Sequence, residues 1–430
     1  MTGTFGVRLG SLATTMIISV LIARCLHPAG RGTYQVLITI AGASMALGHL
    51  SVEQAQTALW PRVGYRSAVA ANSFPLGLVV GGFAAMLALA ASQLCTPFFA
   101  SSAAALSSPA LIALAVGGVP LGISTLYLTN VTMLDARVRT ANRAALVGGA
   151  VQCGGLAILS LSGAMTVASA IAVWALSTAV PCCVMLARLP AGPRLFSLKV
   201  ARRTVITGLS YHAGPACTYL LLRIDIFLLA AQAPAQSVGV YALAVGVAET
   251  ARFAADSLSQ VALPRQAQAD DERAVDVTVR TTRIAALIGI CSALAVAAAA
   301  PVAVPFAYGR AFGSAVPPLL LLLPGVLVLS LARPASVYLL RARRARYVVV
   351  PSAAGLAVNV ATNLALIPVL GAAGCAIASS AGYVVMAVLQ LWLFGSVSGT
   401  CVRSLLPRRA DAGLCLIAVR AVLSRRAVSG

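Results

Sequence analysis

The sequence predicts an all-α polytopic membrane protein, with about twelve transmembrane helices in two pseudo-symmetric six-helix lobes around a central cavity. Hydrophobic residues make up 60% of its 430 residues and charged residues only 10%, with a mean hydropathy of +0.94. A soluble protein could not bury that much apolar surface. The apolar segments are about 20 residues or longer, the length of a membrane-spanning helix, whereas barrel strands are about ten residues long and alternate in polarity.

Windows of about 20 apolar residues give twelve predicted spans. The first six are Phe5–Leu26, Tyr34–Leu59, Asn72–Leu94, Pro109–Leu134, Ala144–Leu161 and Ala164–Ala187. The second six are Thr204–Ala231, Ser237–Leu263, Ile284–Ala307, Val316–Leu340, Tyr347–Leu370 and Ala372–Phe394.

The basic residues accumulate in every second loop, as twelve membrane crossings require. Of the 31 basic residues, 25 lie in the N-terminus, in the tail and in the loops around 62–66, 137–143, 188–203, 265–283 and 341–346. The intervening loops hold Arg24, Arg31 and Arg310, and the spans hold Arg223, Arg252 and Arg333. Because Lys and Arg accumulate in cytoplasmic loops, we expect a multi-pass protein of the plasma membrane with both termini in the cytoplasm.

The net charge of +21 is explained by this topology, and nucleic acid is not an expected partner. The ten cysteines lie mostly in apolar segments, which indicates small buried residues and neither a disulfide framework nor a metal site.

The two halves of the chain resemble each other at a displacement of about 206 residues. "PAGRGTY" at 28–34 parallels "PAQSVGVY" at 234–241, and "WPR" at 60–62 parallels "LPR" at 263–265. Six spans per half give a parallel repeat, an architecture suited to alternating access. The predicted parts are an N-terminal lobe (1–190), a basic linker (191–203), a C-terminal lobe (204–396) and a basic tail (397–430).

Charged residues lie inside the predicted eighth span. Glu249, Arg252 and Asp256 fall at i, i+3 and i+7, on one stripe of a helix. A charge at the bilayer centre costs about 2.5–3.5 kcal/mol by insertion scales, so the stripe must face partners or water. It is either a structural ion-pair ladder, in which each carboxylate neutralises Arg252, or the lining of a hydrated cavity. Glu53 lies eight residues before Pro61 as Asp256 lies eight before Pro264, which suggests carboxylates at matching depth in the two halves.

Other polar residues lie in the seventh and eleventh spans. Arg223 and Asp225 are two residues apart and point away from each other, so at least one should reach another helix. Asn359 and Asn363 are one helical turn apart, and either bind sugar hydroxyls or make a hydrogen bond between helices.

Several stretches resemble, in order, the bacterial polysaccharide and oligosaccharide flippases. "RLGSLATTMIISVLIARCLHPAGRGTYQVLITI" resembles their first helix pair, and "RIDIFLLAAQAPAQSVGVYALAVGVAE" their seventh and eighth helices. "YGRAFGSAVPPLLLLLPGV" and "NVATNLALIPVLGAAGCAIASSAGY" are similar to their C-terminal half. These flippases share a superfamily with multidrug exporters and the lipid II flippase, which has more helices than are predicted here.

The resemblance implies a flippase that moves an undecaprenyl-pyrophosphate-linked oligosaccharide between the leaflets, for cell-surface polysaccharide synthesis. Arginine suits phosphate because it donates two parallel hydrogen bonds. We therefore expect Arg24 and Arg252 to contact the pyrophosphate, with Arg8 and Arg31 in secondary roles. The residues expected to serve in ion coupling or gating are Glu53, Arg223, Asp225, Glu249 and Asp256. The expected glycan contacts are Asn359 and Asn363.

We expect no enzymatic activity and no cofactor or metal beyond a coupling ion, H⁺ or Na⁺. The expected partners are the lipid-linked oligosaccharide and membrane lipids, and a polysaccharide polymerase or glycosyltransferases are further candidates. One alternative is a cation-coupled multidrug exporter, whose cavity would favour acids over arginines. Another is a polytopic glycosyltransferase or polymerase, which would need catalytic acids or bases in external loops, whereas the predicted outer loops are short and contain no acid.

Overall fold

A computed structural model of the chain is helical throughout the residues it describes, which are 2–95, 108–188, 196–268, 270–341, 346–408 and 411. In its first half the helices are α1 (Thr2–Gly48), α2 (Val52–Leu59), α3 (Val63–Cys95), α5 (Pro109–Gly117), α6 (Val119–Leu134), α7 (Val138–Leu161) and α8 (Val167–Leu186). In its second half they are α9 (Leu198–Gln232), α10 (Ala235–Gln268), α11 (Asp271–Tyr308), α12 (Val316–Arg341), α13 (Arg346–Leu370) and α14 (Ala372–Ser398), with short 3₁₀ turns η3 (Arg310–Ala315) and η4 (Val402–Leu405).

The helices confirm the predicted membrane class and the number of crossings. Within the described residues, eleven helical segments are long and apolar enough to cross a membrane, and the first of them, Gly10–Leu59, contains 50 residues. At 1.5 Å per residue this is more than twice the length that one crossing needs. Its backbone turns at His27 (φ 56°), immediately before Pro28, so the segment makes two crossings. Twelve crossings result.

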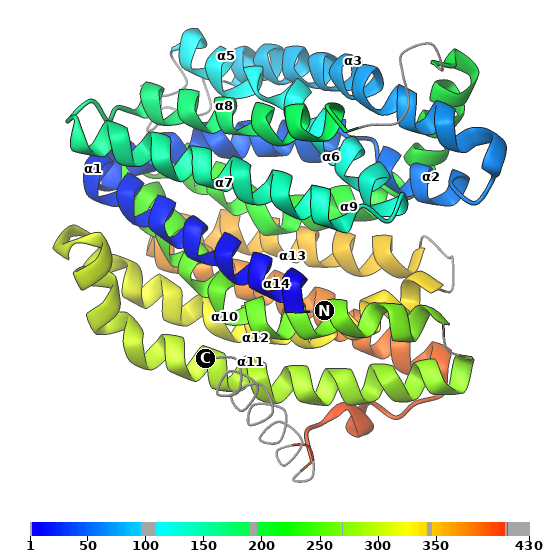
Figure 1. The fold of residues 1–430 in the computed structure, drawn as a ribbon. Helices are drawn as coiled ribbons and strands as arrows, with labels where there is room; N and C mark the ends of the chain where they lie inside the picture. The colour runs from blue at the N-terminus through cyan, green and yellow to red at the C-terminus, as the bar shows by residue number, and fades with distance from the viewer. Residues whose placement is uncertain are drawn as a thin grey trace, which may run out of the picture.

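Two bundles make up the molecule (Figure 1). Helices α1 to α8 form the N-terminal lobe and α9 to α14 form the C-terminal lobe, with α1 running diagonally across the boundary between the lobes. The bend at His27 has a counterpart 206 residues later, where the chain leaves helical geometry at Ala233 between α9 and α10. The repeat seen in the sequence is therefore present in the fold.

Helix α9 begins at Leu198, earlier than the predicted span. Its N-cap is Ser197, whose side chain accepts a hydrogen bond from the Val200 backbone (3.4 Å). Val200 is buried among Leu59, Val69 and other apolar residues of the N-terminal lobe. The first turns of this C-terminal-lobe helix thus pack into the opposite lobe, inside the stretch that the sequence analysis assigned to a linker.

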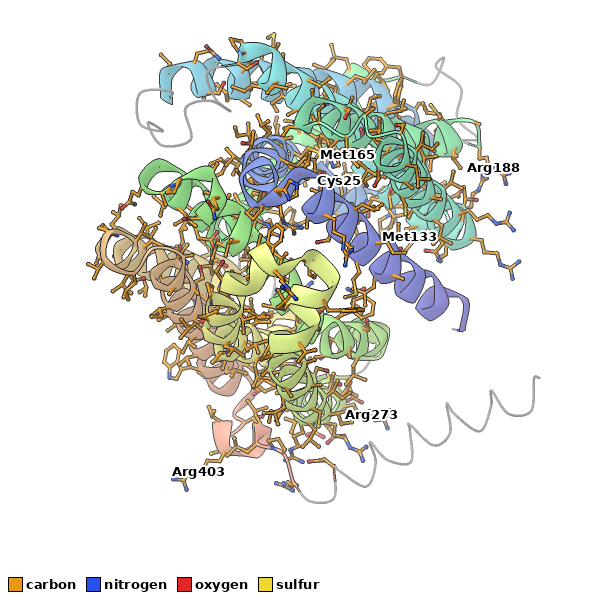
Figure 2. All side chains as sticks on the ribbon, turned by 90° about the vertical axis from the view of Figure 1, so that its left-hand side faces the viewer. Cys25, Met133, Met165, Arg188, Arg273 and Arg403 are labelled. Atoms are coloured by element: carbon orange, nitrogen blue, oxygen red, sulfur yellow. The ribbon has the colours of Figure 1, made fainter. Side chains whose placement is uncertain are left out.

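The turns between helices lie at two ends of the bundles. One end, here named the basic end, holds the turns at 60–62, 135–137 and 399–401, the ends of α8, α10 and α12, and the starts of α9, α11 and α13. Most arginines outside the spans lie in or next to these parts of the sequence. The other, here named the opposite end, holds the turns at 27, 162–166, 233–234, 309–315 and 371. Figure 2 views the molecule from the left-hand side of Figure 1, nearly along the helices.

The lobes touch closely at the opposite end, where α1 crosses α10. A Cβ added to Gly32 would lie 1.8 Å from the carbonyl oxygen of Ala235, and one added to Gly239 would lie 2.0 Å from the carbonyl oxygen of Pro28. Both pairs are displaced by 207 residues, so each helix presents a glycine to the matching carbonyl of the other. This crossing is a pseudo-two-fold contact that only glycines allow.

Candidate functional site

Two ion pairs lie on α9 and α10, the C-terminal-lobe helices that contact α1. Arg223 of α9 pairs with Glu249 of α10 (Nη2 to Oε1, 3.1 Å), and Arg252 of α10 pairs with Asp256 one turn further on (Nε to Oδ2, 2.8 Å). The predicted stripe therefore does not form a single ladder, because its first carboxylate pairs with α9. Pairing within the protein offsets the cost of four charges at membrane depth.

These four side chains remain partly accessible. Arg223 and Glu249 keep 29% and 34% of their side-chain surface exposed, and Arg252 and Asp256 keep 21% and 22%. Glu249 and Arg252 also line a small pocket that is closed by apolar side chains of α9, α10 and α12 and by Tyr383 of α14. The charges thus lie at the edge of an accessible space and are not sealed in dry protein.

Arg252 is placed to accept a further anionic partner. It donates to Asp256 through Nε, so this hydrogen bond does not use the two terminal nitrogens of the guanidinium. Those nitrogens are the pair that binds a carboxylate or phosphate in a fork.

Asp225 lies in a different environment, fully buried inside the C-terminal lobe. It accepts hydrogen bonds from the hydroxyl of Tyr241 on α10, from the hydroxyl of Ser379 on α14 (2.8 Å) and from the backbone of Ile226 (2.8 Å). Arg223 and Asp225 therefore point apart and reach different partners, as their spacing predicts.

Asn359 and Asn363 extend the same buried network. Asn359 donates to Ser379 (3.3 Å), and Asn363 donates to the side-chain and backbone oxygens of Asn359 (3.0 and 2.9 Å). Both side chains are fully buried, and Oδ1 of Asn363 has no partner among the described residues. Their contacts favour the hydrogen bond between helices over direct glycan binding in this conformation.

The arginines of the first helix pair lie at the opposite end. Arg24 donates to the carbonyl oxygens of Ala307 (Nε, 2.7 Å) and Phe306 (Nη2, 2.6 Å). Because these are among the last carbonyls of α11, which have no partner inside the helix, Arg24 caps α11 across the lobe boundary.

Arg31 is buried and donates to the backbone and side-chain oxygens of Ser19 (2.8 and 3.0 Å) while lying over the rings of Tyr308 and Phe312. The side chain of Arg8 lies outside the part of the chain that the structure describes. In this conformation Arg24 and Arg31 join the lobes and do not line the pocket with Arg252.

Glu53 belongs to a polar cluster that sequence reasoning missed. The helical backbone is interrupted after Gly48, and both Leu50 and Ser51 have φ of 50°, in the left-handed region. Such a conformation costs about 1–2 kcal/mol per non-glycine residue. At the break, Glu53 lies 3.1 Å from Nδ1 of His49, and His212 of α9 contacts Ser51 and the carbonyl of Leu47.

No sequence signal links the members of this cluster, here named the break cluster (His49, Ser51, Glu53 and His212). His49 and His212 are 163 residues apart, outside the 206-residue register of the repeat. Gly48 marks the end of α1, but the two residues with positive φ, Leu50 and Ser51, are not glycines, so the left-handed backbone at these positions has no marker in the sequence.

The comparisons with known proteins agree with this fold. The sequence model described as "Polysaccharide biosynthesis protein" matches residues 21–317, more than half of the chain. The chain belongs to this polysaccharide biosynthesis protein family. No curated protein sequence matches it.

Three solved structures show the fold of this family member. It is similar to an inward-facing multidrug resistance MATE transporter of the MOP superfamily (TM-score 0.73, 15% identity, 91% of this chain and 98% of that one). It is equally similar to the lipid II flippase MurJ in an inward closed conformation (TM-score 0.73, 12% identity, 94% and 88%). A third match is a MOP superfamily transporter from Pyrococcus furiosus with a binding pocket of reverse polarity (TM-score 0.65, 16% identity, 91% and 94%).

The family match covers more than half of the chain, and the solved structures share its helical fold. They confirm the family predicted from the sequence and the two-lobed helical architecture.

Proposed function

We propose that this protein translocates a polyprenyl-pyrophosphate-linked oligosaccharide across the plasma membrane, without itself catalysing a reaction. The observation that carries the proposal is the pair of partly exposed arginines, Arg223 and Arg252, on helices that contact the other lobe. An exporter of cations would be expected to present acids without balancing arginines, whereas a pyrophosphate needs a guanidinium whose terminal nitrogens face it. The polysaccharide biosynthesis family supports a glycan-linked cargo.

In this mechanism the polyprenyl tail stays in the lipid while the polar head passes between the lobes. Arg252 binds the phosphates, Glu249 holds Arg223 in place, and Arg8, Arg24 and Arg31 act later in the path. Alternating access opens the basic end to the cytoplasm and then the opposite end to the exterior. Because Arg24 and the glycine crossing join the lobes at the opposite end, they must separate before the cargo leaves on that side.

The cycle is driven by an ion, H⁺ or Na⁺, for which Glu53, Asp225, Glu249 and Asp256 are the candidate carboxylates. Membrane lipids surround the transporter, and a polysaccharide polymerase or glycosyltransferases are its proposed partners. Asn359 and Asn363 would meet the glycan only in a conformation that opens the C-terminal lobe, because here both are buried.

Replacing Arg252 with Ala tests the proposal. We expect Arg252→Ala to reduce surface glycan at least tenfold and to accumulate lipid-linked glycan in the inner leaflet, since the phosphate loses its charged partner. The measurement is the amount of each glycan in a deletion strain that expresses the variant.

The matched control is Arg333→Ala, which removes an exposed arginine of α12. It should keep both glycan pools at the wild-type level, and membrane insertion of both variants is checked by immunoblot of the membrane fraction. Unchanged glycan export by an inserted Arg252→Ala variant would refute the role of this arginine.

A further inference from the structure

A pocket of about 700 Å³ lies between α1 and α3, outside the site described above. Its size is that of a cavity for a small molecule or a single lipid chain. The walls are one face of each helix, on which lining residues recur at intervals of one or two turns. Examples are Val36, Ile40 and Leu47 on α1, and Ala84, Ala88 and Ala91 on α3. Among the described residues, Phe227 of α9 is the one lining residue that comes from the other lobe.

The chemistry of the lining selects an apolar occupant. Apart from one glycine and two serines, the described lining residues carry hydrocarbon side chains. The hydroxyl of Ser44 donates to the carbonyl of Ile40 (2.7 Å), and the hydroxyl of Ser92 donates to the carbonyl of Leu89 (2.7 Å). Each serine thus uses its only hydroxyl hydrogen within its own helix, so neither serine offers a hydrogen to a sugar or a phosphate.

The shape of the pocket suits one long chain. Helices α1 and α3 touch at one lining position, because a Cβ added to Gly48 would lie 2.4 Å from the Cβ of Ala84. From there the pocket follows α1 toward the opposite end as far as Val36, about 18 Å at 1.5 Å per residue. Phe83 and Leu87 of α3 line it and are exposed at the apolar surface of the protein. A chain longer than the pocket can therefore enter from the side and leave its far end in the bilayer.

Arg223 of the candidate site lies beside this pocket. Tyr219, Arg223 and Phe227 are spaced by four residues and share one face of α9. The hydroxyl of Tyr219 contacts α1 at Gly42, where an added Cβ would lie 2.6 Å from it, and Phe227 lines the pocket. Because Arg223 lies between these two contacts, it is level with the pocket. A group that binds Arg223 can thus extend past Phe227 into the apolar space.

The depth of Arg223 distinguishes a lipid in transit from a resident phospholipid. Arg223 lies about 14 Å along α9 from Gln232, its last residue at the opposite end, at 1.5 Å per residue. In a hydrocarbon core about 30 Å thick, this position is near the middle of the membrane. The headgroup of a resident phospholipid stays at the bilayer surface, whereas the anionic head of a translocated lipid must pass this depth.

We propose that this pocket, here named the tail pocket, holds the polyprenyl chain of the cargo next to its head, while the pyrophosphate binds between the lobes with Arg223 beside the pocket. The inference rests on the proposed transport function and assigns a site to the apolar part of the substrate. Arg223 contacts Glu249 through Nη2, so that ion pair does not use its Nε and Nη1. Since α1 and α3 belong to one lobe and Phe227 to the other, movement of the lobes changes the wall between tail and head.

Photo-crosslinking of the full-length protein in lipid nanodiscs tests the tail pocket. The probe is a polyprenyl diphosphate that carries a diazirine on the isoprene unit next to the phosphates, and mass spectrometry locates the labelled peptides. We expect the strongest labelling in the pocket-lining parts of α1 and α3, compared with the exposed surface around Phe306 of α11. Phosphatidylglycerol with a diazirine on an acyl chain should show no such preference. Equal preference by both probes would make the pocket a site for resident lipids and overturn the inference.

Three variants of α3 show whether labelling depends on the pocket itself. Ala88→Phe and Ala91→Phe place a ring in the pocket and should lose the preferential labelling. Ala91 is exposed, so its ring does not have to displace packed residues if Ala88→Phe folds poorly. Ala90→Phe is the matched control, an equal change at an exposed position of α3 that does not line the pocket. It should be labelled as the wild type is, and unchanged labelling of Ala91→Phe would contradict the assignment.

Replacing Arg223 with Ala tests where the head lies. Arg223→Ala should weaken labelling by the diphosphate probe but not by the corresponding uncharged polyprenol, which keeps the tail and lacks the phosphates. Equal labelling of wild type and Arg223→Ala by the diphosphate probe would show that the head does not bind there.

The outcomes separate this inference from the transport proposal. Preferential labelling that Ala91→Phe removes, in a protein whose deletion leaves glycan export normal, would retain the tail pocket and refute the proposed cargo. Loss of glycan export in Arg252→Ala without preferential labelling of the wild type would retain the transport proposal and refute the tail pocket.

Discussion

The charged residues inside the membrane fall into two groups, which differ in their burial and in the number of their partners. Asp225 is fully buried, and three donors surround its carboxylate, so it serves the interior of the C-terminal lobe. Arg223, Glu249, Arg252 and Asp256 are each paired once and partly exposed. Burial and the number of partners therefore separate a stabilising carboxylate from charges that are available to a cargo.

Replacing Asp225 with Asn should destabilise the protein. In one orientation the new NH₂ faces the amide of Ile226, which can only donate. In the other it faces the hydroxyls of Tyr241 and Ser379, which must turn to accept from it and so lose the carboxylate as their acceptor. A buried donor without an acceptor costs about 1–3 kcal/mol.

Thermal unfolding in detergent measures this loss. Asp276→Asn, at an exposed position, should leave the unfolding temperature nearly unchanged. Equal unfolding temperatures for the two variants would show that the donors around Asp225 do not need its charge.

At the scale of elements, the crossing of α1 and α10 determines how closely the lobes approach. Carbonyl oxygens of Pro28 and Ala235 occupy the space that side chains at positions 239 and 32 would need. Arg24 adds hydrogen bonds to the last turn of α11 close by. The opposite end is thus closed by backbone contact, and Arg24 and Arg31 add contacts between the lobes.

Gly32→Ala and Gly239→Ala should each force the crossing apart. An added methyl group that meets backbone cannot be accommodated by a side-chain rotation, and overpacking of this kind costs about 1–3 kcal/mol. Gly246→Ala is the matched control on α10, because nothing lies within 4 Å of its added Cβ.

Thermal unfolding and the distance between lobe labels at the opposite end report the effect. We expect a lower unfolding temperature and a longer distance for the two crossing variants only. If the distance between the lobe labels is the same in Gly32→Ala as in Gly246→Ala, the glycine contact does not limit how closely the lobes approach.

The elements that could be predicted from the sequence are those fixed by local composition. Apolar length and alternating arginines predicted all twelve crossings, and the spacing of Arg223 and Asp225 predicted that they reach different partners. The positive φ of Leu50 and Ser51 could not be predicted, because neither residue is a glycine and because His212, which contacts the break, comes from the distant helix α9. The partners of Glu249 and Arg24 could not be predicted from the sequence either, because they lie on other helices.

At the scale of the whole molecule, the charge asymmetry between the two ends indicates orientation. Most arginines outside the spans lie at the basic end, in its turns or on the helix ends next to them, whereas the opposite end holds Arg24, Arg31 and Arg310. By the positive-inside rule we predict that the basic end faces the cytoplasm, where an anionic lipid surface would attract it.

Reporter fusions test this orientation. A reporter that is active only in the cytoplasm should work when joined after Ser398 and fail when inserted at Gly163, in the turn between α7 and α8. A reporter that is active only after export should give the reverse result. The same reporter pattern at both sites would contradict twelve crossings with alternating loops.

The start of α9 has a consequence for biogenesis. The apolar surface around Leu59 and Val69 is covered by Val200, which belongs to the second half of the chain. When the first six crossings have been synthesised, the N-terminal lobe is therefore incomplete, because its apolar surface at the basic end stays uncovered until Leu198 to Val200 follow. The residues that complete the first lobe are thus the first residues of α9 in the second lobe. The two halves are therefore expected to assemble together.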